Sequence, residues 1–396
     1  MPESKTFLEF FAGVGLVHLG LKVSGWECVY ANDISAKKEE MYRDEFPAAT
    51  FFHREDIWNT DAVLRHLTQR AALATASFPC IDLSLAGQMR GLEGEHSGTL
   101  FGFIQVMRRL KERGLMPPIV MLENVVGLVA GKGGEEFRKT CRAVAELGYY
   151  LDALAVDAKH FVPQSRPRLF IVGTLPEKTP SDVLTGSDWA AEVSGRNGVL
   201  GKKLYDAMRT TGLPTGWVAH RLPQLPPVKN NVAAFIDKDD AQKWWSEDEV
   251  EKHLNRTSEA HYADMERLRR SGETCVGTGF RRIREGTTRV EVRFDGLAGC
   301  LRTAQGGSAR QIVVLIHDRQ IKMRWMTPRE YARLQGAPNF NIKRGINQSL
   351  TGFGDGVCVP VIEWVDANIL TRVYDGVTAP SPQASPDAPR AQMSFL

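Results

Sequence analysis

The stretch from residue 6 to residue 23 restricts the fold of this chain more than any other part of it. Residues 6–11 form an apolar run typical of a buried strand, residues 12–15 (Ala-Gly-Val-Gly) predict a turn, and apolar positions at helical spacing follow from Leu16. A strand, a glycine turn and a helix in this order open a doubly wound sheet that binds a nucleotide, because glycines let a ligand approach the backbone. His18 stands where the dinucleotide fingerprint has its third glycine, which argues against NAD.

Acidic residues follow the next two predicted strands. Strand 27–31 ends at Asn32 and Asp33, and an acid at this tip can accept hydrogen bonds from ribose hydroxyls. Residues 50–52 lead to Asp56 and Ile57, which could accept from an adenine amino group and pack on its ring. A helix cap is the alternative interpretation of both Asp33 and Asp56.

A cysteine and a glutamate follow two further apolar strands. Pro79 fixes its own φ and favours an extended Phe78, so Cys80 is expected on a loop, where a nucleophile would lie. A small buried hydrophobe is the alternative for Cys80. The strand at 118–122 ends in Glu123, and parallel strands end at one edge of a sheet, so Glu123 and Cys80 should be neighbours. The long loop 81–98 is typical of functional loops.

Two arginines precede the strand at 169–173. Arg166 and Arg168 alternate on an extended segment and are therefore expected to face the same way. Two guanidiniums on one side predict an anion clamp, with solvated surface charge as the alternative.

Composition limits the class of protein. With 396 residues, 43% of them hydrophobic, the chain can build a large core and a second domain. The six cysteines are scattered without a CxxC pair, which argues against a disulfide framework and structural zinc and fits a reducing cytoplasm. No run approaches the roughly 18 apolar residues of a membrane span, and we expect no export signal and no metal.

The later half carries the basic residues. A net charge of +3 is too small to indicate nucleic acid by itself. Residues 280–302 are rich in arginine and include the aromatic residues Phe280 and Phe294, which predicts a polyanion-binding face. The arginines are Arg281, Arg282, Arg284, Arg289, Arg293 and Arg302.

Taken in order, these pieces resemble the DNA (cytosine-5)-methyltransferases. The matching segments are residues 11–15, Asn32-Asp33, Asp56-Ile57, Pro79-Cys80, residues 123–125, residues 164–168, Arg329-Glu330, residues 334–336 and the glycine turn at 352–356. They extend from residue 7 to about residue 365. The resemblance implies an α/β fold with a doubly wound, mostly parallel, Rossmann-like sheet and a second, smaller target-recognition domain.

The resemblance also implies the domain boundaries. Residues 1–175 would form the catalytic and cofactor-binding domain, and 176–325 the target-recognition domain. Residues 326–375 would return to the catalytic domain, and the Pro/Ala/Ser-rich tail 376–396 would be disordered.

For the chemistry, the resemblance implies S-adenosylmethionine as methyl donor and a cytosine rotated out of double-stranded DNA. Cys80 would add to C6 of the base, and Glu123 would hydrogen-bond N3 and the exocyclic amine. Arg166 would contact the base carbonyl or a phosphate, and Arg168 would order the site. The implied cofactor residues are Phe11, Gly13, Gly15, Asp33, Asp56, Ile57, Pro79, Leu100 and Asp355, and the implied DNA contacts are Arg281, Arg282, Arg284, Arg302, Thr303, Gly306 and Gly307.

Two positions depart from the family pattern. Ile81 stands where a glutamine usually follows the cysteine, and Asp355 stands where the last glycine turn usually has asparagine. The second change places a negative charge near the expected cofactor pocket.

Other interpretations remain open. An RNA cytosine-5 methyltransferase of the same fold would keep the same motifs, so only the large variable domain favours DNA. A catalytically silent DNA-binding module is disfavoured by the complete set of Cys80, Glu123, Arg166 and Arg168. We expect a cytoplasmic monomer without membrane contact.

The tail suggests a further partner. Gln392, Met393, Phe395 and Leu396 resemble the short peptide by which bacterial proteins bind the replication sliding clamp. An unselected terminus, or a tail that packs on its own domain, is the alternative.

Overall fold

The computed structural model describes residues 4–79, 98–196, 201–239, 243–284, 286–303 and 310–377. Several residues named from the sequence lie outside these ranges. They are Cys80, Ile81, Gly306, Gly307 and the tail residues Gln392, Met393, Phe395 and Leu396.

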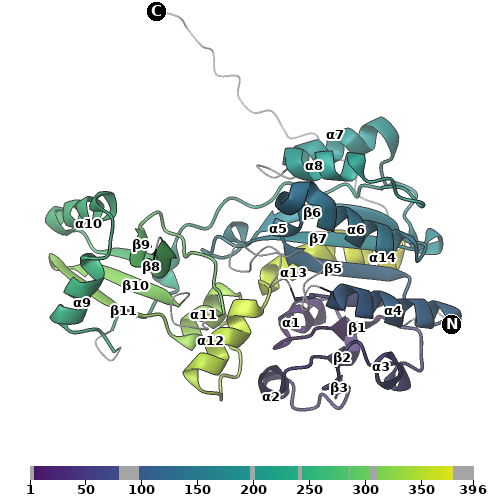
Figure 1. Ribbon diagram of the computed structural model, residues 1–396, viewed down its shortest axis with the longest axis horizontal. Coiled ribbons are helices and arrows are strands. Elements are labelled where there is room, and N and C mark those ends of the chain that lie inside the picture. Colours follow the sequence, from purple (N-terminus) through teal and green to yellow (C-terminus); the bar gives the residue numbers. More distant parts are fainter. Residues whose placement is uncertain are drawn as a thin grey trace, which may run out of the picture.

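The larger of two lobes is built on a seven-stranded sheet with the order β3-β2-β1-β4-β5-β7-β6 (Figure 1). The strands are β1 (Thr6–Phe10), β2 (Glu27–Asn32), β3 (Phe52–His53), β4 (Leu73–Ala76), β5 (Ile119–Val125), β6 (Tyr150–Asp157) and β7 (Pro167–Thr174). Strands β1 to β5 pair in parallel, and β7 is antiparallel to both of its neighbours. The predicted doubly wound, mostly parallel sheet is confirmed. Its strand order reverses between β1 and β4, the place where such sheets bind ligands.

Helices cover both faces of this sheet because its strands are apolar on both sides. One face packs against α1 (Leu16–Lys22), α2 (Ala36–Glu45), α13 (Val359–Val365), the π-helical η7 (Asp366–Leu370) and α14 (Thr371–Asp375). The other packs against α3 (Thr60–His66), α4 (Thr99–Glu112) and α6 (Glu135–Ala145). In β1, Phe7 belongs to the first core, and Leu8 and Phe10 belong to the second, as the alternation of a strand requires.

In the segment after β7, the structure differs from one predicted domain boundary. Residues 176–325 were expected to form a single recognition domain, but α7 (Gly186–Arg196) and α8 (Gly201–Thr210) belong to the larger lobe, beside α5 (Gly127–Ala130) and α6 (Figure 1). Trp189, Val193, Leu204 and Met208 are buried in the same core as α4 and α6. The apolar faces of α7 and α8 therefore dock on the large lobe, and the proline-rich residues 222–227 carry the chain onward.

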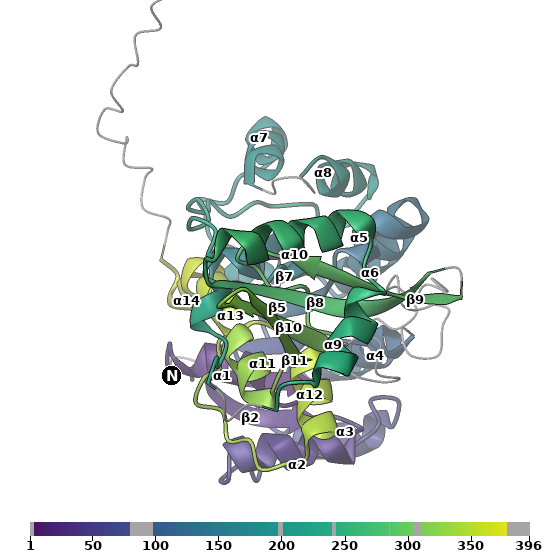
Figure 2. The same ribbon diagram turned by 90° about the vertical axis from the view of Figure 1, so that its left-hand side faces the viewer.

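The smaller lobe is a four-stranded antiparallel sheet with the order β11-β10-β8-β9. Its elements are α9 (Glu247–Leu254), α10 (Glu259–Ser271), β8 (Cys275–Arg284), β9 (Thr287–Arg293), β10 (Gln311–His317) and β11 (Gln320–Trp325). Figure 2 shows α9 and α10 lying over one side of this sheet. Met265, Ile312, Ile316 and Met323 form its separate core, so this lobe has its own hydrophobic stabilisation.

Two helices lie between the lobes (Figure 1). The first, α11 (Pro328–Leu334), begins with the capping box predicted from Thr327, Pro328 and Glu330. The second, α12 (Ile346–Asp355), ends in the glycine-rich stretch that was expected to be a turn. Among the described residues, no helix is both long and apolar enough to span a membrane.

Candidate active site

The glycine turn lies at the carboxyl end of β1. Gly13 and Gly15 have φ of +58° and +84°, a region that favours glycine, and Phe11 shares it at +56°. A Cβ at Gly15 would lie 2.6 Å from the Phe46 ring, so no larger residue fits. The Gly13 N–H donates to Oδ2 of Asp33 at 3.0 Å, and the Ser35 N–H donates to Oδ1 at 2.8 Å. The Asp33 carboxylate therefore holds the turn, and its bond to a ribose remains a prediction.

The expected adenine side is formed by β3, α3 and α4. Ile57 and Leu100 are buried, and a Cβ at Gly102 would lie 2.9 Å from Ile57. Asp56 accepts a hydrogen bond from the Trp58 N–H at 3.0 Å, while Asn59 is the residue that caps α3. Asp56 is thus not the helix cap, and its carboxylate stays at the surface.

Glu123 and Arg168 form an ion pair at the end of β5. Nε of Arg168 lies 3.1 Å from Oε1 of Glu123, and the two side chains are only 14% and 11% exposed. Next to Glu123, the amide of Asn124 donates to the carbonyl of Phe78 at 3.2 Å. That bond holds the segment after β4, in which Pro79 follows Phe78, beside the end of β5 that carries Glu123.

Arg166 has a different environment from the one expected. It is 1% exposed, and its guanidinium donates to the carbonyls of Leu301 at 2.7 Å and Gly354 at 2.9 Å, and also to that of Gly356. The predicted clamp, with both guanidiniums facing one anion, is corrected by these contacts. Arg166 ties three chain segments together, and Arg168 is the arginine that faces the carboxylate. Burial, followed by the nearby Arg168 charge, lowers the pKa of Arg166.

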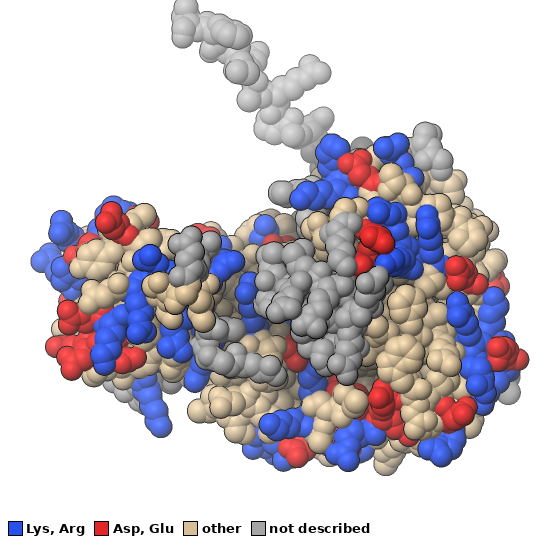
Figure 3. All heavy atoms as spheres, viewed as in Figure 1, with Lys and Arg blue, Asp and Glu red and all other residues tan. Residues whose placement is uncertain are grey.

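The arginines expected to contact DNA lie on the smaller lobe and at its junction with α12. The Arg281 guanidinium lies 4.7 Å from the centre of the Trp325 ring, and Nη1 of Arg282 lies 3.9 Å from Glu291. Arg284 ends β8, and Arg302 packs against Gly354. Figure 3 shows lysines and arginines on this lobe interspersed with acidic residues.

A family model for C-5 cytosine-specific DNA methylases matches residues 5–371. The chain belongs to this family. Among its curated relatives, the type II methyltransferase M.HpaII of Haemophilus parainfluenzae is 24% identical over 392 residues, covering 94% of this chain and 91% of the relative. M.Bsp6I of a Bacillus species is 31% identical over 172 residues, covering 41% of this chain. M2.BsuMI of Bacillus subtilis is 29% identical over 222 residues. The chain spans about half the length of the last two relatives, 50% and 55%.

Solved structures of similar shape support the fold. The Dnmt2 methyltransferase of S. pombe matches with a TM-score of 0.55 and 16% identity, covering 93% of this chain and 99% of that one. The Entamoeba histolytica methyltransferase EhMeth matches with a TM-score of 0.60 and 13% identity, covering 94% and 98%. At these identities the likeness shows the C5-methyltransferase fold alone.

The sequence did not predict a buried polar network that lies under the glycine turn of this family member. The Tyr42 hydroxyl donates to Oε2 of Glu9 at 3.0 Å and lies 2.8 Å from Nδ1 of His18 and 3.8 Å from Sγ of Cys28. The polar Glu9 within an apolar strand was the available signal. Burial raises the pKa of Glu9 to about 8 and lowers that of His18 to about 4. The Tyr42 hydroxyl thus connects the three buried side chains of Glu9, His18 and Cys28.

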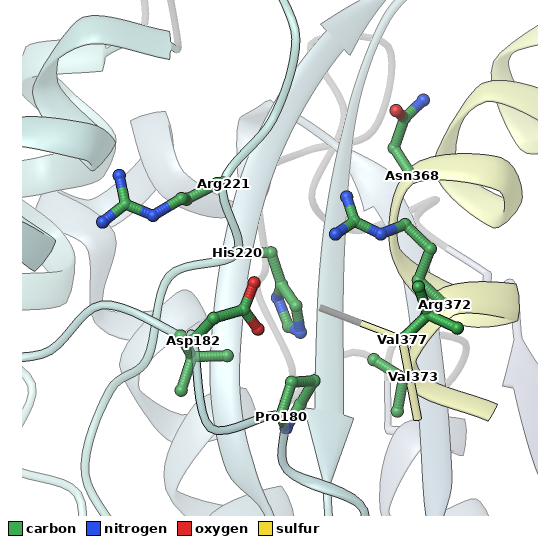
Figure 4. Close-up of a pocket in the computed structure, with 9 residues that line it drawn as sticks. Pro180, Asp182, His220, Arg221, Asn368, Arg372, Val373 and Val377 are labelled. Carbon is green, nitrogen blue, oxygen red and sulfur yellow. The ribbon is translucent and has the colours of Figure 1, made fainter. Parts of the chain in front are cut away.

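A small pocket lies away from this edge, where residues 180–183 meet α14 (Figure 4). His220 lies between Asp182 and Arg372 in this view, and its Nδ1 is 2.9 Å from Oδ2 of the buried Asp152. The cavity volume is about 10 Å³, enough for roughly one water molecule. It is too small for a nucleoside or a base.

Proposed function

We propose that the chain transfers a methyl group from S-adenosylmethionine to C5 of a cytosine in double-stranded DNA. The observation that carries the proposal is the Glu123–Arg168 pair, which lies beside the strand end leading to Cys80 and on the same sheet edge as the glycine turn. Family membership over residues 5–371 supports the reaction type. The named type II relatives support a role in the modification half of a restriction-modification pair.

The glycine turn fits the proposed cofactor. Gly13 leaves the backbone open to a ligand, while Gly15 lets the turn pack closely on Phe46. Asp33 directly follows the neighbouring strand with a carboxylate that can accept from a ribose. Ile57 and Leu100 provide an apolar wall for an adenine ring. Phe11, Asp56, Pro79 and Asp355 complete the proposed set. The bound cofactor would supply an electrophilic methyl group on a sulfonium.

The residues of the sheet edge have separate roles in the proposed reaction. C5 of cytosine is a weak nucleophile, so the Cys80 thiolate adds to C6 and makes C5 enamine-like. Glu123 hydrogen-bonds N3 and the exocyclic amine as charge develops on the ring. C5 would then form a bond to the methyl group as the bond from that methyl to sulfur breaks and a neutral thioether leaves. A solvent base would take the C5 proton, and the electron pair released would expel the Cys80 thiolate from C6.

We assign the contact with the base carbonyl to Arg168 in place of Arg166. Arg168 is adjacent to Glu123 and retains some exposure, whereas the NH₂ groups of Arg166 already donate to main-chain carbonyls. Glu123 is only 8% exposed, so a base still paired within a duplex could not reach it. This burial supports the proposal that the target cytosine rotates out of the helix.

Labelled S-adenosylmethionine incubated with duplex DNA or with tRNA tests the proposal. Label should enter DNA with the wild type and fall to background with Cys80→Ala, because the covalent step is lost. Cys275→Ala, which removes a thiol of the smaller lobe, is the control and should retain activity. A duplex with 5-fluorocytosine at the target should trap a covalent adduct. Label in tRNA alone would favour the RNA-modifying alternative.

A second proposal concerns the tail. We propose that Gln392, Met393, Phe395 and Leu396 bind a replication sliding clamp, because three large apolar residues end an otherwise Pro/Ala/Ser-rich stretch. A tether of this composition would keep the enzyme near newly replicated DNA. A peptide of residues 388–396 should bind the host clamp with a Kd on the order of micromolar, and Gln392→Ala and Leu396→Ala should each weaken it. Binding that ignores both changes would exclude the clamp.

A further inference from the structure

Asp355, the last residue of α12, is held from two sides. Its Oδ2 lies 3.0 Å from Nζ of Lys38 on α2, and its Oδ1 accepts a hydrogen bond from the Thr303 hydroxyl at 2.5 Å. Lys38 belongs to the cofactor side of the molecule. Thr303 belongs to the segment that leaves the smaller lobe, and α12 lies between the lobes (Figure 1). One carboxylate therefore joins the two halves.

Lys38 extends this connection to the glycine turn. It lies in the first turn of α2, whose N-cap is Ser35. Burial alone would lower the pKa of Lys38, but the carboxylates of Asp33 and Asp355 together raise it. Asp33 also accepts from the Gly13 N–H. The Lys38 N–H donates to Oγ of Ser35 at 3.4 Å, and the Ser35 N–H donates to Oδ1 of Asp33 at 2.8 Å. The contacts thus run from Thr303 through Asp355, Lys38, Ser35 and Asp33 to Gly13.

The backbone around Asp355 has little room to move. A Cβ at Gly354 would lie 2.5 Å from the carbonyl carbon of Arg302, and one at Gly356 would lie 2.5 Å from the Leu16 side chain. A Cβ at Gly352 would lie 2.7 Å from Val14 in the glycine turn. Because α12 is packed tightly against both sides, a displacement of residues 301–303 must also displace the end of α12.

We infer that Asp355 is a positioning residue that couples engagement of duplex DNA by residues 301–303 to binding of the cofactor at the glycine turn. This inference rests on the proposed function. Fixing Thr303 on DNA also fixes Asp355 and Lys38 at the rim of the pocket, so less ordering remains when the cofactor binds. Asparagine, the usual family residue, could accept from Thr303 but could not form the ion pair with Lys38. The aspartate at position 355, which differs from the family pattern, therefore acts together with Lys38 on α2.

A linkage measurement tests the coupling. The Kd of S-adenosylhomocysteine, which cannot react, is measured by calorimetry without DNA and with saturating duplex that carries the sequence methylated in cells. DNA should tighten binding at least about fivefold in the wild type, and the cofactor product should tighten DNA binding by the same factor. Reciprocity checks that both titrations report one equilibrium.

Variants separate coupling from simple structural damage. Thr303→Val should reduce the ratio of the two Kd values to less than about twofold, while Thr303→Ser should retain it because the hydroxyl remains. Asp355→Asn should also reduce the ratio because the bond to Lys38 loses its charge. Lys37→Met, at an exposed neighbour on the same helix, is the control and should behave as the wild type.

Two outcomes would overturn the inference while the proposed function stands. One is a wild type that methylates DNA but has a ratio near one. The other is a Thr303→Val variant that keeps the full ratio. A wild type that binds neither ligand would contradict the proposed function itself.

Discussion

Arg166 and Arg168 are two residues apart, yet their different surroundings indicate different roles. The guanidinium of Arg166 is buried among main-chain carbonyls, and that of Arg168 faces the Glu123 carboxylate. A buried arginine with several acceptors stabilises the fold, because its removal leaves carbonyls without donors. An arginine beside a recessed carboxylate at the sheet edge can act on a substrate.

Substitutions at these two positions should therefore have different effects. Arg166→Lys cannot reach both Leu301 and Gly354, and should lower the free energy of unfolding by about 3 kcal/mol. Arg168→Ala should change that free energy less and lower kcat by about 100-fold. Urea unfolding and single-turnover methylation measure the two effects. If both variants lost the same free energy of unfolding, the separate roles of Arg166 in the fold and Arg168 in catalysis would be contradicted.

Glu9 should produce a pH dependence of stability. Its pKa is about 8 in the folded chain against an ordinary value of 4.5, so between these values the folded state holds a proton that the unfolded state has lost. Stability should therefore fall as pH rises, by about 1.4 kcal/mol per pH unit, and level off above the folded pKa. The lowered pKa of His18 acts only below its ordinary value of 6.5, so His18 adds nothing to the slope between pH 6.5 and 8.

Glu9→Gln tests this dependence. The amide keeps the shape of the side chain and cannot ionise, so the variant should gain stability relative to the wild type as pH rises through that window. Glu27→Gln, at an exposed residue of β2, is the control and should keep the wild-type slope. Parallel slopes for the Glu9 variant and the wild type in urea unfolding would refute the assignment.

Helix α11 has contacts that the sequence could predict and contacts that it could not. Thr327, Pro328 and Glu330 indicated the start of the helix because capping is local, and the capping box confirms it. The sequence did not indicate that Glu330 also bonds Arg324 at 2.6 and 2.9 Å and the Asp237 N–H at 2.9 Å. These partners depend on how β11 and residue 237 pack, which no local pattern encodes.

The buried Arg324–Glu330 pair should hold α11 to the smaller lobe. The two side chains are 1% and 0% exposed, so removing one charge leaves the other buried without an opposite charge beside it. Glu330→Gln and Arg324→Met should each lower the free energy of unfolding by about 3–5 kcal/mol, and the double variant should recover part of the loss. Thermal and urea unfolding of the wild type, the two single variants and the double variant complete a double-mutant cycle. Single variants that cost less than about 1 kcal/mol would show that the pair is not needed.

The difference between local patterns and long-range packing also explains which other positions could be predicted from the sequence. Glu123 could be placed at the carboxyl edge of the sheet because apolar strand periodicity and parallel pairing together fix where a strand ends. The association of α7 and α8 with the large lobe, and of Arg166 with Gly354, joins residues far apart in the sequence. Such contacts are decided by packing in three dimensions, and spacing along the chain carries little information about them.

For the whole molecule, the smaller lobe should provide most of the affinity for DNA. Arg282 and Arg289 are direct partners in the β8–β9 register, and like charges facing each other are unfavourable unless an anion lies between them. Alanine at both positions should weaken DNA binding and reduce its salt slope by about one unit per lost phosphate contact. Cofactor affinity without DNA should not change.

Arg267→Ala is the matched control for this prediction, since Arg267 is an exposed arginine of α10 that lies 3.4 Å from Asp264. It should leave the salt slope near that of the wild type. A fall in DNA-free cofactor affinity for the Arg282 and Arg289 variant would mean that the two lobes do not divide binding in this way.

Bisulfite sequencing of host DNA reports both whether this chain methylates cytosine in duplex DNA and which sequence it recognises. A bacterial host without cytosine methylation expresses the wild-type chain or Cys80→Ala. We predict protected cytosines in one short sequence context with the wild type and none above background with the variant. Protection that is absent from wild-type cells, or equal in both, would show that this chain does not methylate cytosine in DNA through Cys80.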